Sequence, residues 1–473
     1  MTRGTPPNDL RQLRDRAGLS QRDVAERVNR AAADQGHHAA AATADMVSRW
    51  ERGKVIPLPI YRRLLAQVFG VSVEELKLDQ QVQSVGDFMA AFVDEEIDPR
   101  VEVSQQEWCR TRRALNTQRH ALAQVAAGLY EPSYRLGATG LITHPTWLPA
   151  ELIDMTSVQL QHRPDAPDPE LDGTEPVTGH VRPRQTLVRR YPRYTHAVRD
   201  LAHPRLFENR LAWRIAGMNW ADGGRMAFAD TTYFAAVDVF EATAHELAYV
   251  ALDEDGTPHR RSPTMRDLPL RKAIGDPFNL ARRPVMCAIS TLTIRNGADG
   301  ADFLLHRRDS RSVAAAGGML QVIPSGIFQP SSVMPAAREA DFDLWRNVMR
   351  EYSEELLGNP EHDGDGQPVQ YDDEPFAGLD QARRDGQVRI YVLGVALDAL
   401  TLVGELLTVA VFDAALFDDF ARDFVERNDE GSIVNTRAPF TEAGIAELLA
   451  SGRLAPAGAG CVELAWQHRG RIL

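Results

Sequence analysis

The residues best suited to chemistry in this 473-residue chain are three glutamates, Glu351, Glu354 and Glu355, in one acidic stretch. On a helix, at 100° per residue, their side chains fall within about 100° of arc. Three carboxylates this close repel one another unless a cation lies among them. Carboxylate oxygens are ligands that suit Mg²⁺ or Mn²⁺. The spacing therefore predicts a divalent-cation site or, as the alternative, a solvated acidic patch on a surface helix.

The elements that would position these glutamates are a helix and several strands. A helix is expected over residues 341–357, because five apolar residues oppose the glutamates at helical spacing. These residues are Trp345, Val348, Met349, Tyr352 and Leu356. Apolar, β-branched runs predict strands over 285–294, 302–306, 319–323, 388–397 and 406–412. Further helices are expected over 233–252 and from Thr441 to about residue 449. Such a mixture indicates an α+β or mixed-sheet α/β domain.

The acidic stretch, R-E-Y-S-E-E-L-L-G from Arg350, with P-S-G upstream, resembles the box of the Nudix family over about residues 283–415. The resemblance implies an α/β/α sandwich that hydrolyses nucleoside-diphosphate derivatives with a bound metal. It implies Glu351, Glu354 and Glu355 as metal ligands for Mg²⁺ or Mn²⁺. It also implies a carbonyl ligand from Gly326 and an orienting role for Arg350.

Three features differ from that family's pattern. About ten extra residues separate Gly326 from Arg350, Ser332 stands where the box has its first glutamate, and the closing glycine comes one position late. Glu374 and Glu405 are candidates for the carboxylate that many members supply from a later loop. Two readings stay open: an active hydrolase with an altered loop, or a ligand-binding fold without turnover.

A second informative stretch covers residues 43–54, T-A-D-M-V-S-R-W-E-R-G-K. Thr43 suits the N-cap of a short helix, and Gly53 suits the left-handed position after it. Val47 and Trp50 form one apolar stripe. A helix this short needs neighbours, and helical patterns lie on both sides. Ser20 caps one of them, with Asp23 three residues on. Five short helices in under 80 residues indicate a helix-turn-helix domain.

The blocks L-R-x-x-G-L-S-Q-x-x-V-A and V-S-R-W-E-R-G-K resemble the XRE (phage-repressor-like) helix-turn-helix family over about residues 8–78. The resemblance implies that the third helix enters the major groove of double-stranded DNA. It implies base contacts by Ala44, Asp45 and Arg49, with Ser48 on the same surface. Gln21, Thr43, Arg52 and Lys54 would lie near phosphates. Arg14 and Glu51 would form a structural ion pair. An insertion at residues 29–42 is expected to lengthen the second helix, with a loop around 36–38.

Charge is distributed unevenly along the chain. The net charge is −13, but residues 1–78 carry 13 Lys+Arg and 9 Asp+Glu, a net of +4. The remainder carries 40 and 57, a net of −17. A basic head on an acidic body fits a head that contacts phosphates. Three scattered cysteines and the absence of a long apolar run lead us to expect a cytoplasmic protein that does not contact a membrane.

The domain layout follows from these patterns. We expect a head at 1–79, a helical connecting segment at 80–162, a Pro- and acid-rich linker at 163–184, and an α/β domain at 185–473. In the connecting segment, helices are expected around 85–93 and from Ser104, which forms a capping box with Glu107. Trp108, Leu115, Leu122 and Leu129 recur every seven residues. This seam predicts half of a dimeric coiled coil or packing within one chain.

Together these features predict a multidomain protein with an all-α head and a Nudix-like α/β C-terminal domain. The favoured hypothesis is a homodimeric, sequence-specific transcriptional regulator that senses a nucleotide-type small molecule. The alternative is a metal-dependent nucleoside-diphosphate-derivative pyrophosphohydrolase with a DNA-tethering head.

Overall fold

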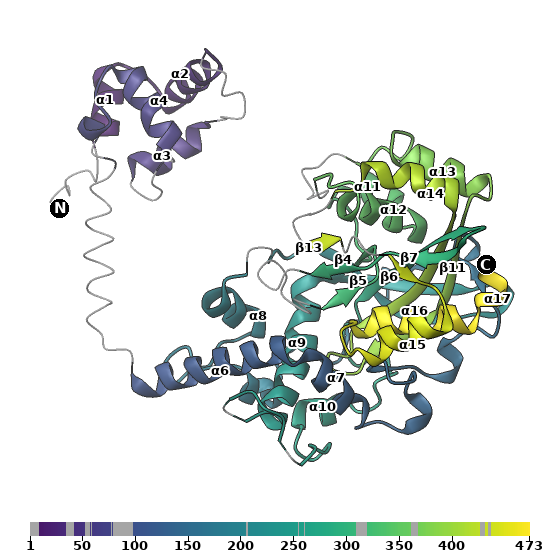
Figure 1. Cartoon of the computed structure of the whole chain (residues 1–473). Helices are drawn as coiled ribbons and strands as arrows, with labels where there is room; N and C mark the ends of the chain where they lie inside the picture. The colour runs from purple at the N-terminus through teal and green to yellow at the C-terminus, as the bar shows by residue number, and fades with distance from the viewer. Residues whose placement is uncertain are drawn as a thin grey trace. The chain divides into compact units, whose positions relative to one another are not determined.

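The chain divides into two compact units, Met1–Pro99 and Arg100–Leu473, and each is described by itself (Figure 1). The computed structural model describes residues 9–34, 42–52, 57, 59–76, 78, 98–204, 207–253, 255–259, 261–308, 319–360, 368–425, 431–433 and 437–473. The first unit is helical, and the second combines helices with a mixed sheet. The expected combination of a helical head with a later α/β domain is therefore confirmed. The helix expected around 85–93 lies outside the described residues.

The first unit, called the head below, consists of short helices around one apolar core. They are α1 (Leu10–Arg16), α2 (Gln21–Asp34), α3 (Ala44–Glu51), α4 (Pro59–Phe69) and the 3₁₀ turn η1 (Glu74–Leu76). The predicted capping box opens α2: Asp23 N donates to Ser20 Oγ at 3.1 Å, and Ser20 N donates to Asp23 Oδ2 at 2.7 Å. Residues from all four α-helices form the core, including Leu10, Val24, Val28, Val47, Trp50, Leu64 and Leu65.

The second unit is built on a mixed sheet that has eight strands among the described residues. The main path runs β1-β11-β12-β6-β7-β14, with β10 paired to β6 and β2 paired to β11. The strands are β1 (Leu141–Ile142), β2 (Ile153–Asp154), β6 (Cys287–Gly297), β7 (Gly300–Phe303), β10 (Ser325–Ile327), β11 (Val388–Asp398), β12 (Gly404–Asp413) and β14 (Ala438–Pro439). Only the β12–β6 pair among them is parallel. The strong strands expected over 285–294, 388–397 and 406–412 are confirmed as β6, β11 and β12.

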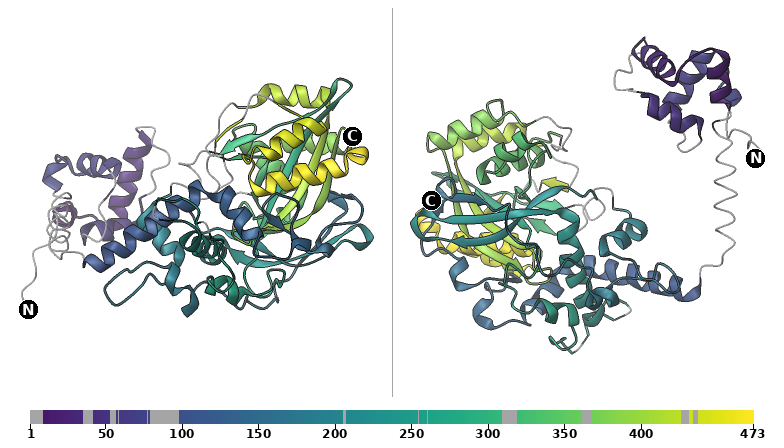
Figure 2. Two further views of the ribbon diagram at one scale, coloured as in Figure 1. Left: turned by 60° about the horizontal axis from the view of Figure 1, so that its bottom comes forward. Right: turned by 180° about the vertical axis from the view of Figure 1, so that it is seen from behind.

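Helices cover both faces of this sheet (Figure 1). On one face lie α11 (Pro335–Ala340), α12 (Leu344–Glu355), α13 (Phe376–Arg384) and α14 (Ala414–Phe420), and on the other lie α15 (Glu442–Ala450) and α16 (Pro456–Gln467). Figure 2 shows the same layers from behind. The strands alternate accordingly: Leu406 and Phe412 of β12 belong to one apolar core, whereas Leu407 and Val409 belong to the other. The two faces of β12 are therefore both buried, as in an α/β/α layer arrangement.

The remaining elements of the second unit are further helices, short turns and two smaller sheets. The helices are α6 (Pro99–Thr117), α7 (Arg119–Ala127), α8 (Tyr194–Ala197), α9 (Tyr233–Ala251), α10 (Pro269–Ile274), α17 (Arg469–Ile472) and the π-helical turn η6 (Val198–Ala202). Short 3₁₀ turns are η2 (Pro132–Tyr134), η3 (Pro145–Trp147), η4 (Met155–Ser157), η5 (Pro176–Val181), η7 (Ala221–Gly223) and η8 (Ala421–Asp423). Two three-stranded sheets contain β3 (Gln159–His162), β5 (Arg225–Thr232) and β4 (Leu211–Asn219), and β13 (Gly431–Ile433), β8 (His306–Arg308) and β9 (Leu320–Gln321).

The expected linker at 163–184 and the separate segment at 80–162 need correction. Residues 100–184 all belong to the second unit. Leu171 and Val181 are buried in it, and Arg184 N donates to Ser104 Oγ at 3.0 Å. Two apolar side chains and a few long-range hydrogen bonds are enough to hold a stretch whose composition is typical of linkers.

The seam of α6 and α7 packs inside one chain. Trp108, Leu115 and Leu122 are at most 4% exposed within the second unit, so the coiled-coil alternative for this seam is wrong. Ser104 is also not an N-cap, because α6 begins at Pro99. Among the described residues, no helix combines the length and apolar character needed to cross a bilayer.

Candidate functional site

Helix α3 is held by its inner face and by its N-cap. Thr43 Oγ1 accepts a hydrogen bond from Met46 N at 3.3 Å, as predicted. Val47 and Trp50 are 0% and 2% exposed, and the Trp50 ring lies 5.2 Å from that of Tyr61 on α4. The helix therefore takes its position from the core of the head, and Asp45 and Arg49 on its opposite face are exposed.

A buried polar network connects the end of α3 to α1 and α2 and is called the brace below. Glu51, at the end of α3, is 4% exposed and accepts hydrogen bonds from Arg14 on α1 at both carboxylate oxygens. This confirms the expected ion pair, and the hydrogen bond to Glu51 raises the pKa of Arg14. Gln21 Nε2 also donates to Glu51 Oε2, at 2.7 Å. Gln21, expected near a phosphate, is thus a third member of the brace, and its phosphate contact stays a prediction.

The outer face of α3 presents the residues expected to contact bases. Ala44, Asp45 and Arg49 are exposed, and Ser48 is half-buried. Arg49 Nε lies 2.8 Å from Asp45 Oδ2, so the two residues form an exposed i,i+4 ion pair. Thr43 and Arg52, at the two ends of the helix, are also exposed. Lys54 and Gly53 lie outside the described residues.

Asn29 closes the insertion that separates α2 from α3. The helix α2 extends to Asp34, so the expected lengthening is confirmed, while the loop around 36–38 lies outside the described residues. The Asn29 side chain donates to Ala42 O at 2.9 Å and accepts from Ala42 N at 2.6 Å. This two-way clamp fixes the chain just before the Thr43 cap. Sequence patterns do not reveal it, because the partners are 13 residues apart across the insertion.

In the second unit, α12 carries the three glutamates of the acidic stretch. Asp343 caps the helix by accepting from Arg346 N at 2.9 Å. Its apolar stripe packs into the core, where Tyr352 is fully buried and its hydroxyl lies 2.7 Å from Thr293 Oγ1 on β6. Glu355 is 4% exposed, whereas Glu351 and Glu354 are half-buried. The helix is therefore real, and its acidic face is partly covered rather than a freely solvated patch.

Strand β10 lies against that acidic face. Ser325 N donates to Glu355 Oε2 at 3.3 Å. At Gly326 there is no room for a side chain, because a Cβ atom would overlap the carboxylate of Glu351. The structure thus brings Gly326, Glu351 and Glu355 together across 25 or more residues of sequence. Among the described residues, however, no group of three or more His, Cys, Asp or Glu is arranged to hold a metal ion. The oxygen ligands have the right chemistry for Mg²⁺ or Mn²⁺, and the metal stays a prediction.

Arg350 of α12 is held by hydrogen bonds next to the three glutamates. Arg350 is 4% exposed, and its Nη2 donates to Gln329 O at 2.7 Å and to Asn347 Oδ1 at 3.0 Å. Burial alone would lower the pKa of Arg350, but the nearby acidic groups of Tyr371, Asp341 and both half-buried glutamates of α12 raise it. An orienting contact from Arg350 to Glu351 stays a prediction.

Glu405 is linked to the same region through two serines. Ser290 Oγ donates to Glu405 Oε2 at 3.4 Å and lies 3.2 Å from Ser325 Oγ. Ser325 therefore connects the two glutamates. Its amide binds Glu355, and its hydroxyl contacts Ser290, which binds Glu405. Glu374 instead accepts from Gly378 N at 3.2 Å, at the start of α13. Of the two candidates for an additional carboxylate, Glu405 is the one connected to the cluster.

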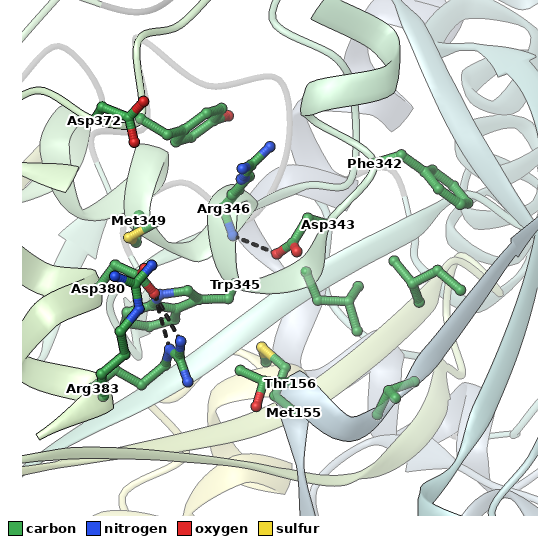
Figure 3. A pocket seen from close by; sticks show the side chains of 15 residues that line it. Met155, Thr156, Phe342, Asp343, Trp345, Arg346, Met349, Asp372, Asp380 and Arg383 are labelled. Atoms are coloured by element: carbon green, nitrogen blue, oxygen red, sulfur yellow. Dashed lines mark hydrogen bonds and ion pairs between the residues drawn. The ribbon is translucent and has the colours of Figure 1, made fainter. Parts of the chain in front are cut away.

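A pocket of about 440 Å³ lies on the other side of α12 (Figure 3). The helix contributes Trp345, Arg346 and Met349, which are about 180° around its axis from the glutamates. The ion pair between Asp380 and Arg383 of α13, at 3.0 Å, also lines the pocket and lies beside Trp345 in Figure 3. Trp345 is 5% exposed, and its Nε1 has no hydrogen-bond partner in the described part of the chain. A pocket of this size is large enough for a small molecule.

The comparison with protein families concerns the head alone. A family model described as the SP15 N-terminal domain matches residues 10–76. The match begins at the first residue of α1 and ends at the last residue of η1. It therefore coincides with the helical core of the head and does not extend into the second unit. The search of curated proteins gave no match to this chain.

Proposed function

We propose that this chain is a sequence-specific, DNA-binding transcriptional regulator whose head is of the XRE type. The observation that supports it best is the contrast between the two faces of α3. The inner face is fixed by Trp50 and by the Arg14–Glu51 pair, while the outer face exposes Asp45 and Arg49. A helix held rigidly with polar side chains outward is what major-groove reading requires. The net charge of +4 on residues 1–78 favours contact with phosphates.

The proposal includes a homodimer and a ligand. Helix-turn-helix heads bind as dimers to half-sites about one helical turn apart, so we propose a pseudo-palindromic operator. The second unit, with its helices on both faces of a mixed sheet, is proposed to have a Nudix-like fold that binds a nucleotide-type molecule. The pocket beside α12 supports a ligand-binding role, since a bound molecule there would contact the helix that carries Glu351.

Arg49 is the residue whose replacement tests base reading. Arg49→Ala is expected to weaken operator binding by roughly 1–3 kcal/mol and to relax base preference at one position, because a bidentate arginine–guanine contact is lost. Selection of bound fragments from a random duplex pool, followed by sequencing, measures both effects. Arg22→Ala on α2 is the matched control, because Arg22 is 83% exposed and pairs only with Glu26 among the described residues. An Arg49→Ala consensus identical to that of the wild type would remove Arg49 from the base-reading set.

The ligand part of the proposal is tested separately. Enrichment of bound genomic fragments, with and without nucleotide sugars, ADP-ribose and dinucleotides, should show a change in occupancy for one of them. Isothermal titration of the same compounds against the full chain distinguishes a ligand-binding unit from one that only contacts other proteins. Heat exchange with none of the compounds would contradict the nucleotide part of the proposal and leave DNA binding untouched.

The juxtaposition of Gly326, Glu351 and Glu355 favours a second candidate, a metal-dependent pyrophosphohydrolase. If the chain hydrolyses nucleoside-diphosphate derivatives with Mg²⁺ or Mn²⁺, Glu354→Gln combined with Glu355→Gln should abolish phosphate release. Glu339→Gln, at an exposed position on α11, should leave the rate unchanged. A double variant as active as the wild type would exclude these glutamates from catalysis.

A further inference from the structure

A basic hairpin projects from the acidic second unit. Residues Arg184–Arg190, called the arginine hairpin below, turn back so that Arg184 and Arg190 form an antiparallel bridge. Gln185 N and Thr186 N both donate to Arg189 O at 2.9 Å, and Arg189 N donates to Thr186 Oγ1 at 3.2 Å. The turn is thus closed by its own backbone and by one hydroxyl.

The base of the arginine hairpin is fixed to α6. Arg184 N donates to Ser104 Oγ at 3.0 Å, and Gln105 Nε2 donates to Arg184 O at 2.9 Å. Tyr191, just after the hairpin, is 5% exposed and packs with Trp108 in one apolar cluster. The tip is therefore exposed while its position on the unit is fixed.

The charges of the hairpin are not neutralised. Between Glu175 and Asp200 the sequence contains no acidic residue. Arg189 and Arg190 are exposed, and no carboxylate of the described residues pairs with Arg184, Arg189 or Arg190. The neighbouring Arg193 differs, because it pairs with Asp172 at 3.1 Å and Asp238 at 3.0 Å. Two of these guanidinium groups are hydrogen-bonded to backbone carbonyls, Arg184 to Leu187 O at 2.7 Å and Arg190 to Arg182 O at 2.6 Å, but neither bond neutralises a charge. Three arginines without a carboxylate partner among the described residues thus gather on a unit whose sequence carries a net negative charge.

The tip between these arginines is apolar. Val188 is 92% exposed and Leu187 is 40% exposed, and Val103 of the adjoining α6 is 60% exposed. These three side chains lie close to the arginines in the sequence or on the helix that holds the hairpin, so apolar and basic groups share this surface. A narrow turn closed by one antiparallel bridge can approach a DNA groove, where arginines contact phosphates and apolar side chains contact sugars and bases.

We propose that the arginine hairpin is a second DNA-binding element, which contacts the phosphate backbone beside the site read by the head. This inference rests on the proposed function, because it requires that the head bring the chain to DNA. An acidic protein segment is the other partner that such a surface would fit. The narrow turn and its exposed apolar tip favour the duplex.

The test compares the full chain with Arg189→Ser/Arg190→Ser on the selected operator, with and without flanking duplex. Each lost phosphate contact removes roughly 0.9 from the slope of log affinity against log salt, so the double variant should lose about 1.8. The corresponding loss of affinity is about tenfold or more at 0.1 M salt, and it should appear only with the flanking duplex. Arg189→Lys/Arg190→Lys keeps the charges and should keep the wild-type slope.

The matched control is Arg422→Ser/Arg453→Ser, which removes two exposed charges elsewhere on the same unit. It should leave the slope unchanged, and thermal melting should show that both double variants are folded. Wild-type binding with an unchanged slope for Arg189→Ser/Arg190→Ser would overturn the inference alone. Binding to polyglutamate is measured for the same variants. If Arg189→Ser/Arg190→Ser lost binding to polyglutamate and kept wild-type binding to DNA, the inference would be overturned in favour of an acidic partner. Failure of the wild type to bind any duplex would reject the proposed function itself.

Discussion

Glu51→Ala is expected to unfold the head at room temperature while the second unit stays folded. Glu51 is 4% exposed, and its carboxylate is the shared acceptor for Arg14 and Gln21. Removing one partner of a buried ion pair costs about 3–5 kcal/mol, because the other charge is left uncompensated. A core of this size supplies only about 3–5 kcal/mol of stability in total. Calorimetry of the full chain should therefore lose its head transition, and operator binding should be lost with it.

Two further variants separate the charge from the hydrogen bonds. Glu51→Gln keeps an acceptor for Arg14, so it should destabilise the head less than Glu51→Ala does. Glu26→Ala removes an exposed partner of Arg22 on α2 and should leave both transitions in place. If the head of Glu51→Ala has the same melting temperature as that of the wild type, these contacts of Glu51 do not position α3. The argument that the outer face of α3 is rigidly held then fails.

The helices of the head were predictable in part because their capping residues act locally. Thr43 and the Ser20–Asp23 box cap helices within three residues of themselves, and both are confirmed. The contacts of Gln21 with Glu51 and of Asn29 with Ala42 were not predictable, since they depend on how α2 packs against α3. Local capping can be inferred from sequence, whereas the partner of a long polar side chain depends on the tertiary fold.

The second unit shows where composition misleads. The stretch 163–184 has the prolines and acids of a linker, yet it is packed because Leu171 and Val181 find apolar neighbours. The seven-residue spacing of Trp108, Leu115, Leu122 and Leu129 was compatible both with a dimeric coiled coil and with packing inside one chain. Only the fold distinguishes the two. Spacing correctly placed the glutamates of α12 on one face. It gave no sign that Glu355 would be buried beside Ser325, because β10 lies 30 residues upstream.

Glu241 of α9 carries the largest expected effect on the second unit. It is 2% exposed and lies 2.9 Å from Arg112 Nη1 on α6 and 2.6 Å from Arg119 Nη2 on α7. Arg112 also donates to the hydroxyl of Tyr194 on α8, and burial lowers the pKa of the adjacent His245 to about 3, so that ring is neutral. Glu241 is therefore the carboxylate that balances two buried guanidinium groups and joins α9 to α6 and α7, while Arg112 extends the network to α8.

Glu241→Ala should lower the free energy of unfolding of the second unit by about 3–5 kcal/mol, because both arginines lose their counter-charge in a buried site. Denaturant unfolding followed by tryptophan fluorescence measures this difference. Glu447→Ala, at an exposed position on α15, is the control and should leave the curve within about 0.5 kcal/mol. Equal unfolding curves for Glu241→Ala and Glu447→Ala would mean that the ion pairs of Glu241 with Arg112 and Arg119 contribute nothing to stability.

The pH dependence of the stability of the second unit tests the charge of Glu241 independently. Although burial opposes ionisation, Arg119 and Arg112 lower the pKa of Glu241 below its ordinary 4.5. A carboxylate with a lowered pKa stabilises the fold above its unfolded value, and that stabilisation is lost as pH falls through its folded pKa. The stability difference between the wild type and Glu241→Gln should therefore be constant near neutral pH and should narrow below pH 4.5. A difference that widens on acidification would show that Glu241 is protonated in the native state, and that Arg112 and Arg119 are compensated by some other group.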